Sequence, residues 1–103
     1  MEYKVTTSRR AKRNIADIGK YIATQLHAPE TAREYLDNFK NQIAELNHMP
    51  KRFALVSDER LAKMGLRSAQ VKNYSIFYIV EEQTQAVTVI SVMYNRRDWV
   101  NLL

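Results

Sequence analysis

The chain has 103 residues, with 16 Lys and Arg against 11 Asp and Glu, so its formal net charge is +5. This length is typical of one domain built from two packed layers, and it leaves too little interior for a deep cofactor chamber. We therefore expect one domain over residues 1–103, with its functional site on a shallow surface. The positive charge favours anionic partners, either nucleic acid or an acidic protein.

The absence of cysteine excludes disulfide bridges, thiolate catalysis and thiol-based zinc sites. No cluster of His, Asp and Glu shows the spacing of metal ligands, so we expect neither a metal nor another cofactor. Residues 1–5 lack the apolar core of a signal peptide, and no apolar run approaches the ~18 residues of a membrane span. The sequence thus predicts a cytoplasmic protein without membrane contact.

The first half of the chain predicts a short strand and two helices. Tyr3 and Val5 alternate with polar residues, and Ser8 is a suitable N-cap for the helix that follows. Pro29 suits the first turn of a second helix, and the short connection makes the two helices antiparallel. Apolar residues recur at helical spacing at Ala11, Ile15, Ile18, Ile22 and Leu26, and again at Ala32, Tyr35, Leu36, Phe39, Ile43 and Leu46.

The second half predicts an ordered loop followed by three strands. The loop covers Lys51 to Met64 and has room for one helical turn, and its expected core anchors are Phe53, Leu55, Val56 and Leu61. Runs rich in β-branched and aromatic residues then cover 65–73, 74–82 and 86–94, and a turn without glycine at 82–85 joins the last two.

Alternation within these strands predicts which side chains share a face. One face of the middle strand holds Tyr74, Ile76, Tyr78 and Val80, while the other holds Phe77 and Ile79; in the last strand Val87 and Val89 are expected opposite Ile90 and Val92. The fold class is α+β in the order β-α-α-β-β-β, an antiparallel sheet with the helical hairpin on one face. The opposite face is expected to present outward-pointing cations, and function is sought there.

Three motifs carry a resemblance to a known family. They are Leu66-Arg67, the run Lys72 to Tyr78, and Val92-Met93-Tyr94-Asn95-Arg96-Arg97-Asp98-Trp99. Together with the element order they resemble the RelE/ParE superfamily, the toxins of bacterial type II toxin-antitoxin modules. The resemblance covers essentially the whole chain and is most specific from Arg67 to Trp99. It implies a compact α+β toxin, silenced by a cognate antitoxin in a toxin-antitoxin hetero-oligomer.

Two activities occur on this scaffold, and fold alone does not choose between them. ParE-type toxins poison DNA gyrase, whereas RelE-type toxins cleave messenger RNA in the ribosomal A site. The closing residues from Arg96 onward look like those of ParE-like sequences, so inhibition of gyrase is the leading hypothesis. The alternative is a ribosome-dependent, metal-independent endoribonuclease, and a third class is a binding module that has lost toxicity.

The interferase alternative names its own catalytic residues. Cleavage of RNA without a metal needs a base, an acid and fixed cations that stabilise the phosphorane. The resemblance assigns these tasks to Arg67 as phosphate clamp, Lys72 as a second cation and Tyr94 as base. Against this assignment, the positions where RelE-type enzymes place a further arginine and a tail tyrosine fall near Asn95 and Asn101. Structural alternatives for the three residues are surface cations and an aromatic packed on Tyr74 or Trp99.

The resemblance also implies two sets of binding residues. Contacts to the target, gyrase or the ribosome with its messenger RNA, are expected at Arg67, Lys72, Tyr94, Arg96 and Arg97. Contacts to the antitoxin are expected along the helical hairpin at Arg10, Arg13, Lys20 and Tyr21. A charged helix face is more often simply solvated.

Overall fold

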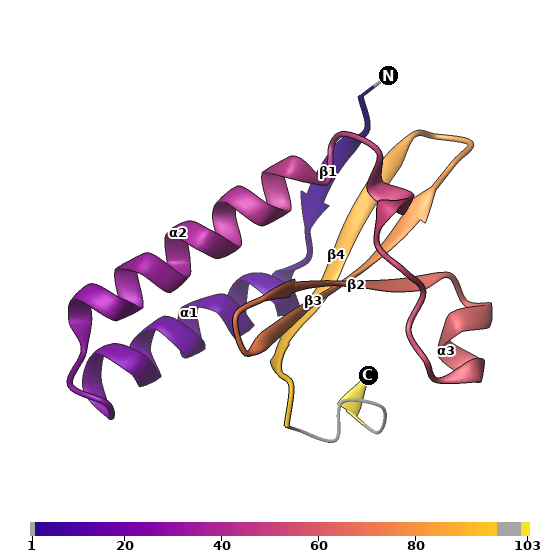
Figure 1. Cartoon of the computed structure of the whole chain (residues 1–103). Helices are drawn as coiled ribbons and strands as arrows, with labels where there is room; N and C mark the ends of the chain where they lie inside the picture. The colour runs from indigo at the N-terminus through magenta and orange to yellow at the C-terminus, as the bar shows by residue number, and fades with distance from the viewer. Residues whose placement is uncertain (1, 97–101) are drawn as a thin grey trace.

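The computed structural model describes residues 2–96 and 102–103 and shows a four-stranded sheet with a helical hairpin on one face (Figure 1). The strand order is β1-β4-β3-β2, in which β1 is parallel to β4 and the other neighbours are antiparallel. The predicted α+β order is confirmed. The elements are β1 (Lys4–Thr7), α1 (Arg9–Thr24), α2 (Pro29–Glu45), a 3₁₀ helix (Pro50–Arg52), α3 (Glu59–Lys63), β2 (Leu66–Val71), β3 (Tyr74–Glu81) and β4 (Ala86–Tyr94).

The helices α1 and α2 form the predicted antiparallel hairpin. The Ser8 hydroxyl caps α1 by accepting the Ala11 amide at 3.0 Å, and Pro29 opens α2. Gly19 is buried against Leu36, and a Cβ built on it would lie only 3.0 Å from Leu36 Cδ2. The glycine therefore allows a close approach of the helices. Leu26 lies beyond the end of α1 and is 55% exposed, so the predicted apolar stripe of this helix ends at Ile22.

The main core lies between the hairpin and the sheet. Its large, fully buried side chains include Phe39, Leu46, Ile76, Tyr78, Val87 and Val89. The prediction that Tyr74, Ile76, Tyr78 and Val80 share one face of β3 is confirmed, and the structure shows that this face meets the helices. Burying a side chain of this size stabilises the fold by about 2–3 kcal/mol.

A β-bulge changes the predicted faces of β4. Phe77 pairs with Ser91 but Tyr78 pairs with Val89, which leaves Ile90 as an extra residue. As a result Val92 pairs with Ile76 and faces the helices together with Val89. The prediction that Val92 lies opposite Val87 and Val89 is therefore wrong, because simple alternation cannot reveal an inserted residue.

A second, smaller cluster lies on the other face of the sheet. The segment around α3 and the C-terminal Leu103 pack there against Val56, Leu61, Leu66, Phe77 and Met93. The predicted anchors Phe53, Val56 and Leu61 are confirmed, whereas Leu55 is 44% exposed and pairs only through its backbone with Arg67. In Figure 1, α3 lies beside β2, far from the hairpin. The face opposite the hairpin is thus partly covered by the chain itself.

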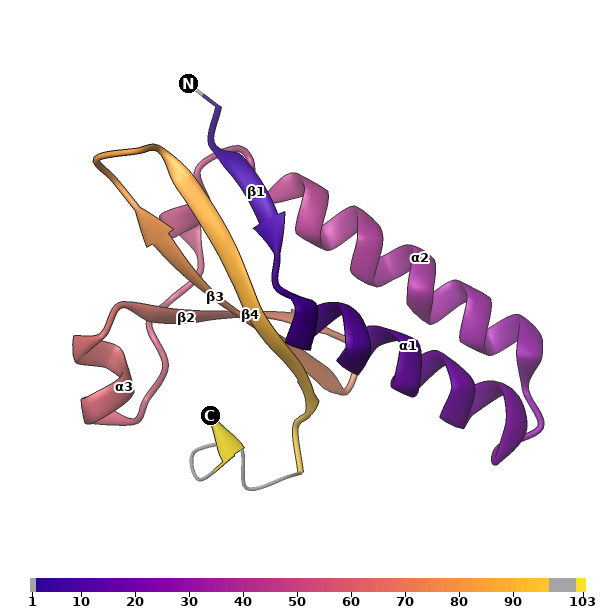
Figure 2. The same ribbon diagram turned by 180° about the vertical axis from the view of Figure 1, so that it is seen from behind.

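The start of α1 protects the part of β4 that β1 does not reach. β1 pairs with β4 only from Ala86 to Val89. Beyond that point Asn14 Oδ1 accepts the Val92 amide at 3.1 Å and the Ser91 hydroxyl at 2.8 Å. Figure 2 shows β1 and α1 following one another along this side of β4. A helix side chain therefore replaces a neighbouring strand as hydrogen-bond partner of this edge.

Candidate functional site

A groove of about 740 Å³ opens at the end of the sheet where α1, the start of α2, the β2–β3 turn and the end of β4 meet. We call it the tyrosine groove, because Tyr21, Tyr35, Tyr74 and Tyr94 line it. Its charged lining residues are Arg10 and Asp17, and Ile18, Ile22, Leu26 and Leu102 supply apolar surface. Tyr21 is 52% exposed and Leu26 55%, so the groove presents apolar surface to solvent. Exposed aromatic and aliphatic surface of this kind suits a protein partner.

Tyr74 lies at the centre of the aromatic residues in this groove. Its ring meets Tyr35, Phe39 and Tyr94 edge to face, with centroid distances of 5.7, 5.6 and 5.4 Å. Burial and the neighbouring tyrosines raise the pKa of Tyr74, so its phenol remains protonated at neutral pH. Lys72 Nζ lies 4.7 Å from the centre of the Tyr35 ring, in cation–π contact. These contacts describe a packed aromatic surface at the groove.

Several predicted site residues meet at the tyrosine groove. Tyr94, a predicted target contact, packs on Tyr74 and shares the groove with Arg10 and Tyr21, two predicted antitoxin contacts. Arg10 Nη2 also donates to the Leu102 carbonyl at 2.5 Å, which ties α1 to the C-terminal residues. The structure therefore places members of both predicted sets on one surface.

Other predicted residues surround this groove or fall outside it. Arg13 and Lys20 are exposed on α1 but do not line the groove, and Arg96 is exposed just after β4. Lys72 reaches the groove through its contact with Tyr35. Arg97, the remaining predicted target contact, lies outside the described residues.

Arg67 belongs to a different environment. It faces the helix layer near the start of β2, and its Nη1 donates to the Phe53 carbonyl at 2.7 Å and the Lys51 carbonyl at 3.3 Å. Lys72 follows the other end of β2, so about 13 Å of strand separates Arg67 from Val71 alone. The expectation that Arg67 and Lys72 form one outward-facing phosphate site is wrong. Arg67 instead holds the loop to the sheet.

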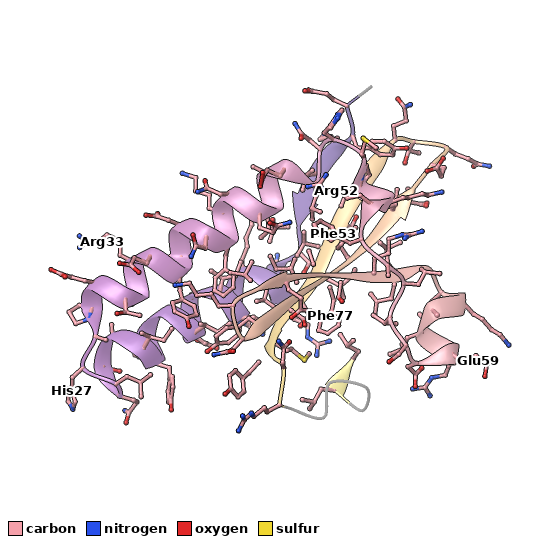
Figure 3. All side chains as sticks on the ribbon, in the orientation of Figure 1. His27, Arg33, Arg52, Phe53, Glu59 and Phe77 are labelled. Carbon is pink, nitrogen blue, oxygen red and sulfur yellow. The ribbon has the colours of Figure 1, made fainter. Side chains whose placement is uncertain are left out.

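Two neighbours complete this clamp on the loop. The Tyr78 hydroxyl donates to the Pro50 carbonyl at 2.6 Å, and burial raises the pKa of Tyr78. Arg52 donates to the His48 carbonyl and lies 4.8 Å from the centre of the Phe53 ring. Figure 3 shows Arg52 and Phe53 together on this segment. Both arginines thus donate to backbone carbonyls, which gives Arg67 a structural task in holding the loop.

The strands contribute little positive charge to the face away from the hairpin. On this face β2, β3 and β4 place no Lys, Arg or His, and Lys4 on the edge strand β1 is the one strand cation there. Near the β2–β3 turn the face holds a neutral trio, Gln70, Ser75 and Asn95. Gln70 Nε2 donates to Ser75 Oγ at 2.7 Å, Ser75 Oγ donates to Asn95 Oδ1, and Asn95 Nδ2 donates to Gln70 Oε1 at 2.8 Å. The expected cationic face is therefore wrong.

The sequence did not predict this trio, because only cations and a tyrosine were considered as site residues on the strands. The sequence does contain a pattern that indicates the contact, because antiparallel pairing of β2 with β3 puts Gln70 directly opposite Ser75. Neutral polar residues at paired strand positions usually indicate a solvated face, so they gave no reason to name a site.

Two further classes of site were tested within the described part of the chain. Residues 2–96 and 102–103 contain no group of three or more His, Cys, Asp or Glu that could hold a metal ion. Over the same residues, no helix has the length and apolarity needed to cross a bilayer.

Comparison with known proteins identifies the family. The family model for the ParE toxin of the type II toxin-antitoxin system parDE matches residues 5–99. No curated protein sequence matches the chain significantly.

Solved structures agree with this match at the level of the fold. A chain of the chromosomal ParDE toxin-antitoxin system from P. aeruginosa superimposes with a TM-score of 0.73 at 16% identity, covering 90% of this chain and 96% of that one. A chain of the RelBE2 complex from Mycobacterium tuberculosis gives 0.66 at 18% identity, with 91% and 99% covered. A mutant of the E. coli toxin RelE in the free state gives 0.64 at 18% identity, with 99% and 93% covered.

The match of the family model over most of the chain, together with the shared fold, shows that this protein belongs to the ParE toxin family of type II toxin-antitoxin systems, within the RelE/ParE superfamily.

Proposed function

We propose that this toxin arrests growth by binding DNA gyrase and that it has no active site of its own. The observation that carries the proposal is that β2, β3 and β4 place no cation on the sheet face opposite the hairpin. A metal-independent ribonuclease must stabilise the charge that develops on the phosphorane, and it does so with preorganised cations. On this face the three C-terminal strands offer amides and hydroxyls that already bond to one another.

The contacts of the three candidate catalytic residues support the same proposal. Arg67 is bonded to two backbone carbonyls, Lys72 lies over Tyr35, and Tyr94 packs on Tyr74. Arg67 lies near one end of β2, while Lys72 and Tyr94 lie near the other. An acid, a base and a phosphate clamp must reach the same phosphate, and these side chains are placed too far apart to do so.

The tyrosine groove is the surface that we propose for protein partners. Its exposed aromatic and aliphatic side chains match the composition of interface cores, and Arg10 and Asp17 can fix the orientation of a partner. We propose that gyrase contacts Tyr94, Lys72 and the arginines that follow β4, and that the cognate antitoxin covers Arg10 and Tyr21. Because Tyr94, Arg10 and Tyr21 line one groove, antitoxin binding there would exclude the target directly. Gyrase and the alternative target, the ribosome, lie in the cytoplasm, and we propose the same location for the toxin.

Two assays with purified components test the proposal. The first measures supercoiling of relaxed plasmid by gyrase while the toxin is titrated, and the second measures messenger RNA cleavage in a translating ribosome complex. We expect inhibited supercoiling or trapped cleaved DNA in the first, and intact messenger RNA in the second. Cleavage at the A site with unaffected gyrase would overturn the proposal in favour of the interferase. Toxicity in cells without either effect would exclude both targets.

A further inference from the structure

The outer side of α1 carries a row of cations. Arg9, Arg13 and Lys20 are all exposed, and their spacing of four and seven residues places them on one side of the helix. Ala16 lies on the same line between Arg13 and Lys20 and is also exposed, so no bulky side chain interrupts the row. The buried residues of α1 face the other way, toward the core. We call Arg9, Arg13 and Lys20 the α1 stripe.

The charges of the hairpin are divided between its two helices. α1 contains five Lys and Arg and one acid, whereas α2 contains two Lys and Arg and four acids. The acid of α1, Asp17, lies one turn from Arg13 but lines the tyrosine groove, and it forms no ion pair with the stripe. None of the three stripe cations is paired with an acid among the described residues. The stripe therefore presents unpaired positive charge to solvent.

The positive charge at the start of the stripe destabilises the helix. Arg9, Arg10 and Lys12 all lie in the first turn of α1, which contains no acid. The partial positive charge of the helix dipole at this end favours acids and disfavours cations. Local sequence choices that oppose the folded state are expected mainly where residues have a functional task. The cations at this end therefore point to a negatively charged ligand.

The length and chemistry of the stripe suit the backbone of a DNA duplex. Lys20 follows Arg9 by eleven positions, so their Cα atoms lie about 16 Å apart along the helix axis. Double-stranded DNA carries one phosphate charge per ~1.7 Å of its axis, so this length spans about ten phosphates. Recognition of single strands relies on aromatic side chains that stack on bases, and the stripe contains none. An exposed helix also fits the major groove of B-DNA better than the narrow one of duplex RNA.

We propose that the α1 stripe binds the phosphate backbone of double-stranded DNA. Arg9, Arg13 and Lys20 each contact a phosphate, and the affinity does not depend on the base sequence. This assigns Arg13 and Lys20 to DNA and not to the antitoxin, the partner that the resemblance implied for them. The inference goes beyond the proposed function, because the stripe lies outside the tyrosine groove. If both hold, the stripe keeps the toxin on the DNA that gyrase acts on.

Fluorescence anisotropy of a short labelled DNA duplex, titrated with the purified toxin at several salt concentrations, tests the proposal. For three phosphate contacts we expect log K to fall against log salt with a slope of about −2.7. Arg13→Ala and Lys20→Ala should each make this slope shallower by about 0.9. Arg60→Ala and Lys63→Ala are the matched controls, because they remove the same charge from exposed positions of α3, and they should keep the wild-type slope. Equal slopes for stripe and control variants, or no binding at about 50 mM salt, would overturn the proposal.

Two comparisons separate DNA from other occupants of the stripe. Duplex RNA of the same sequence should bind more weakly at equal salt, and RNA binding as tight as that of DNA would overturn the choice of DNA. Sedimentation of the toxin alone at the same concentrations should show a monomer. A dimer that dissociates when salt is added would also overturn the proposal, because the acids of α2 in a second copy would then occupy the stripe.

Arg9→Glu gives an independent readout. The substitution removes a DNA contact and places an acid where the helix dipole favours one. DNA binding at low salt should weaken about tenfold, because a like charge then faces the phosphates, while the Tm of the toxin should rise. A lower Tm, or an unchanged affinity for DNA, would contradict the task assigned to Arg9.

The outcome is independent of the target. Salt-dependent DNA binding through the stripe with no effect on gyrase would uphold this inference and refute the proposed target. Inhibition of gyrase by a toxin that does not bind DNA would do the reverse.

Discussion

Arg67 shows how a residue that matches a catalytic pattern can have a structural task. Its guanidinium holds the carbonyls of Lys51 and Phe53, so it fixes the segment that connects the hairpin to α3. Arg67→Ala should lower the free energy of unfolding by about 1–3 kcal/mol, because two backbone carbonyls lose a charged donor. Urea denaturation measures this change. Arg60→Ala, at an exposed position of α3 where the side chain forms no bond to another described residue, is the matched control and should stay within about 0.5 kcal/mol.

If Arg67 were instead a phosphate clamp, the result would be the opposite. The variant would keep the stability of the wild-type protein and lose toxicity. A stable but inactive Arg67→Ala protein would therefore contradict the structural role.

The raised pKa of Tyr78 predicts that the free energy of unfolding decreases at alkaline pH. Burial raises its pKa above the ordinary value of about 10, so the folded state favours the neutral phenol. A raised pKa contributes stability that is complete below the unfolded pKa and is lost as pH rises through the folded pKa. We expect the free energy of unfolding to fall as pH rises above about 10, and to fall less steeply in Tyr78→Phe.

The same variant has a second effect at neutral pH. It removes the hydroxyl that donates to Pro50 and should cost about 1 kcal/mol there. Denaturation curves recorded from neutral to alkaline pH measure both effects. If the free energy of unfolding fell equally steeply with pH in the wild-type protein and in Tyr78→Phe, the role of this phenol would be contradicted. Some decrease should remain in both proteins, because the pKa of Tyr74 is also raised.

At the scale of the elements, Asn14 connects α1 to the part of β4 that β1 does not pair with. Asn14→Ala leaves the Val92 amide without its acceptor in a largely buried position. We expect a loss of about 1–3 kcal/mol and faster hydrogen exchange at Val92. Asn41→Ala, on the exposed face of α2, is the control and should change neither quantity. Unchanged exchange at Val92 would show that another group protects this edge.

The order and faces of most elements could be predicted from the sequence because they follow local patterns. Helical stripes, Ser8 and Pro29 as helix starts, and alternation in β3 are properties of neighbouring residues, and the structure confirms them. The bulge at Ile90 and the packing of Gly19 on Leu36 depend on how distant segments meet. No pattern within one strand or one helix contains that information.

The candidate site was predicted less well for a related reason. Tyr94, Tyr21 and Arg10 were named for different partners, and only the fold brings them to one groove. Arg67 and Lys72 are five residues apart in the sequence, but the strand between them separates their surroundings.

At the scale of the whole molecule, the toxin is a sheet with a helical hairpin on one face and few strand cations on the other. The tyrosine groove lies at one end of β3 and β4. The smaller cluster under α3 covers part of the face away from the hairpin. This arrangement suits our proposal that the toxin acts by occupying a partner protein and that an antitoxin in the tyrosine groove excludes the target.

The most direct test of this account is the supercoiling activity of gyrase titrated with the wild-type toxin and with Tyr94→Glu. Tyr94 is 36% exposed, so the substitution adds a charge to the groove without opening the core. The account predicts that the wild-type toxin inhibits supercoiling and that folded Tyr94→Glu requires at least tenfold more protein for the same inhibition. Full gyrase activity at saturating wild-type toxin would contradict it.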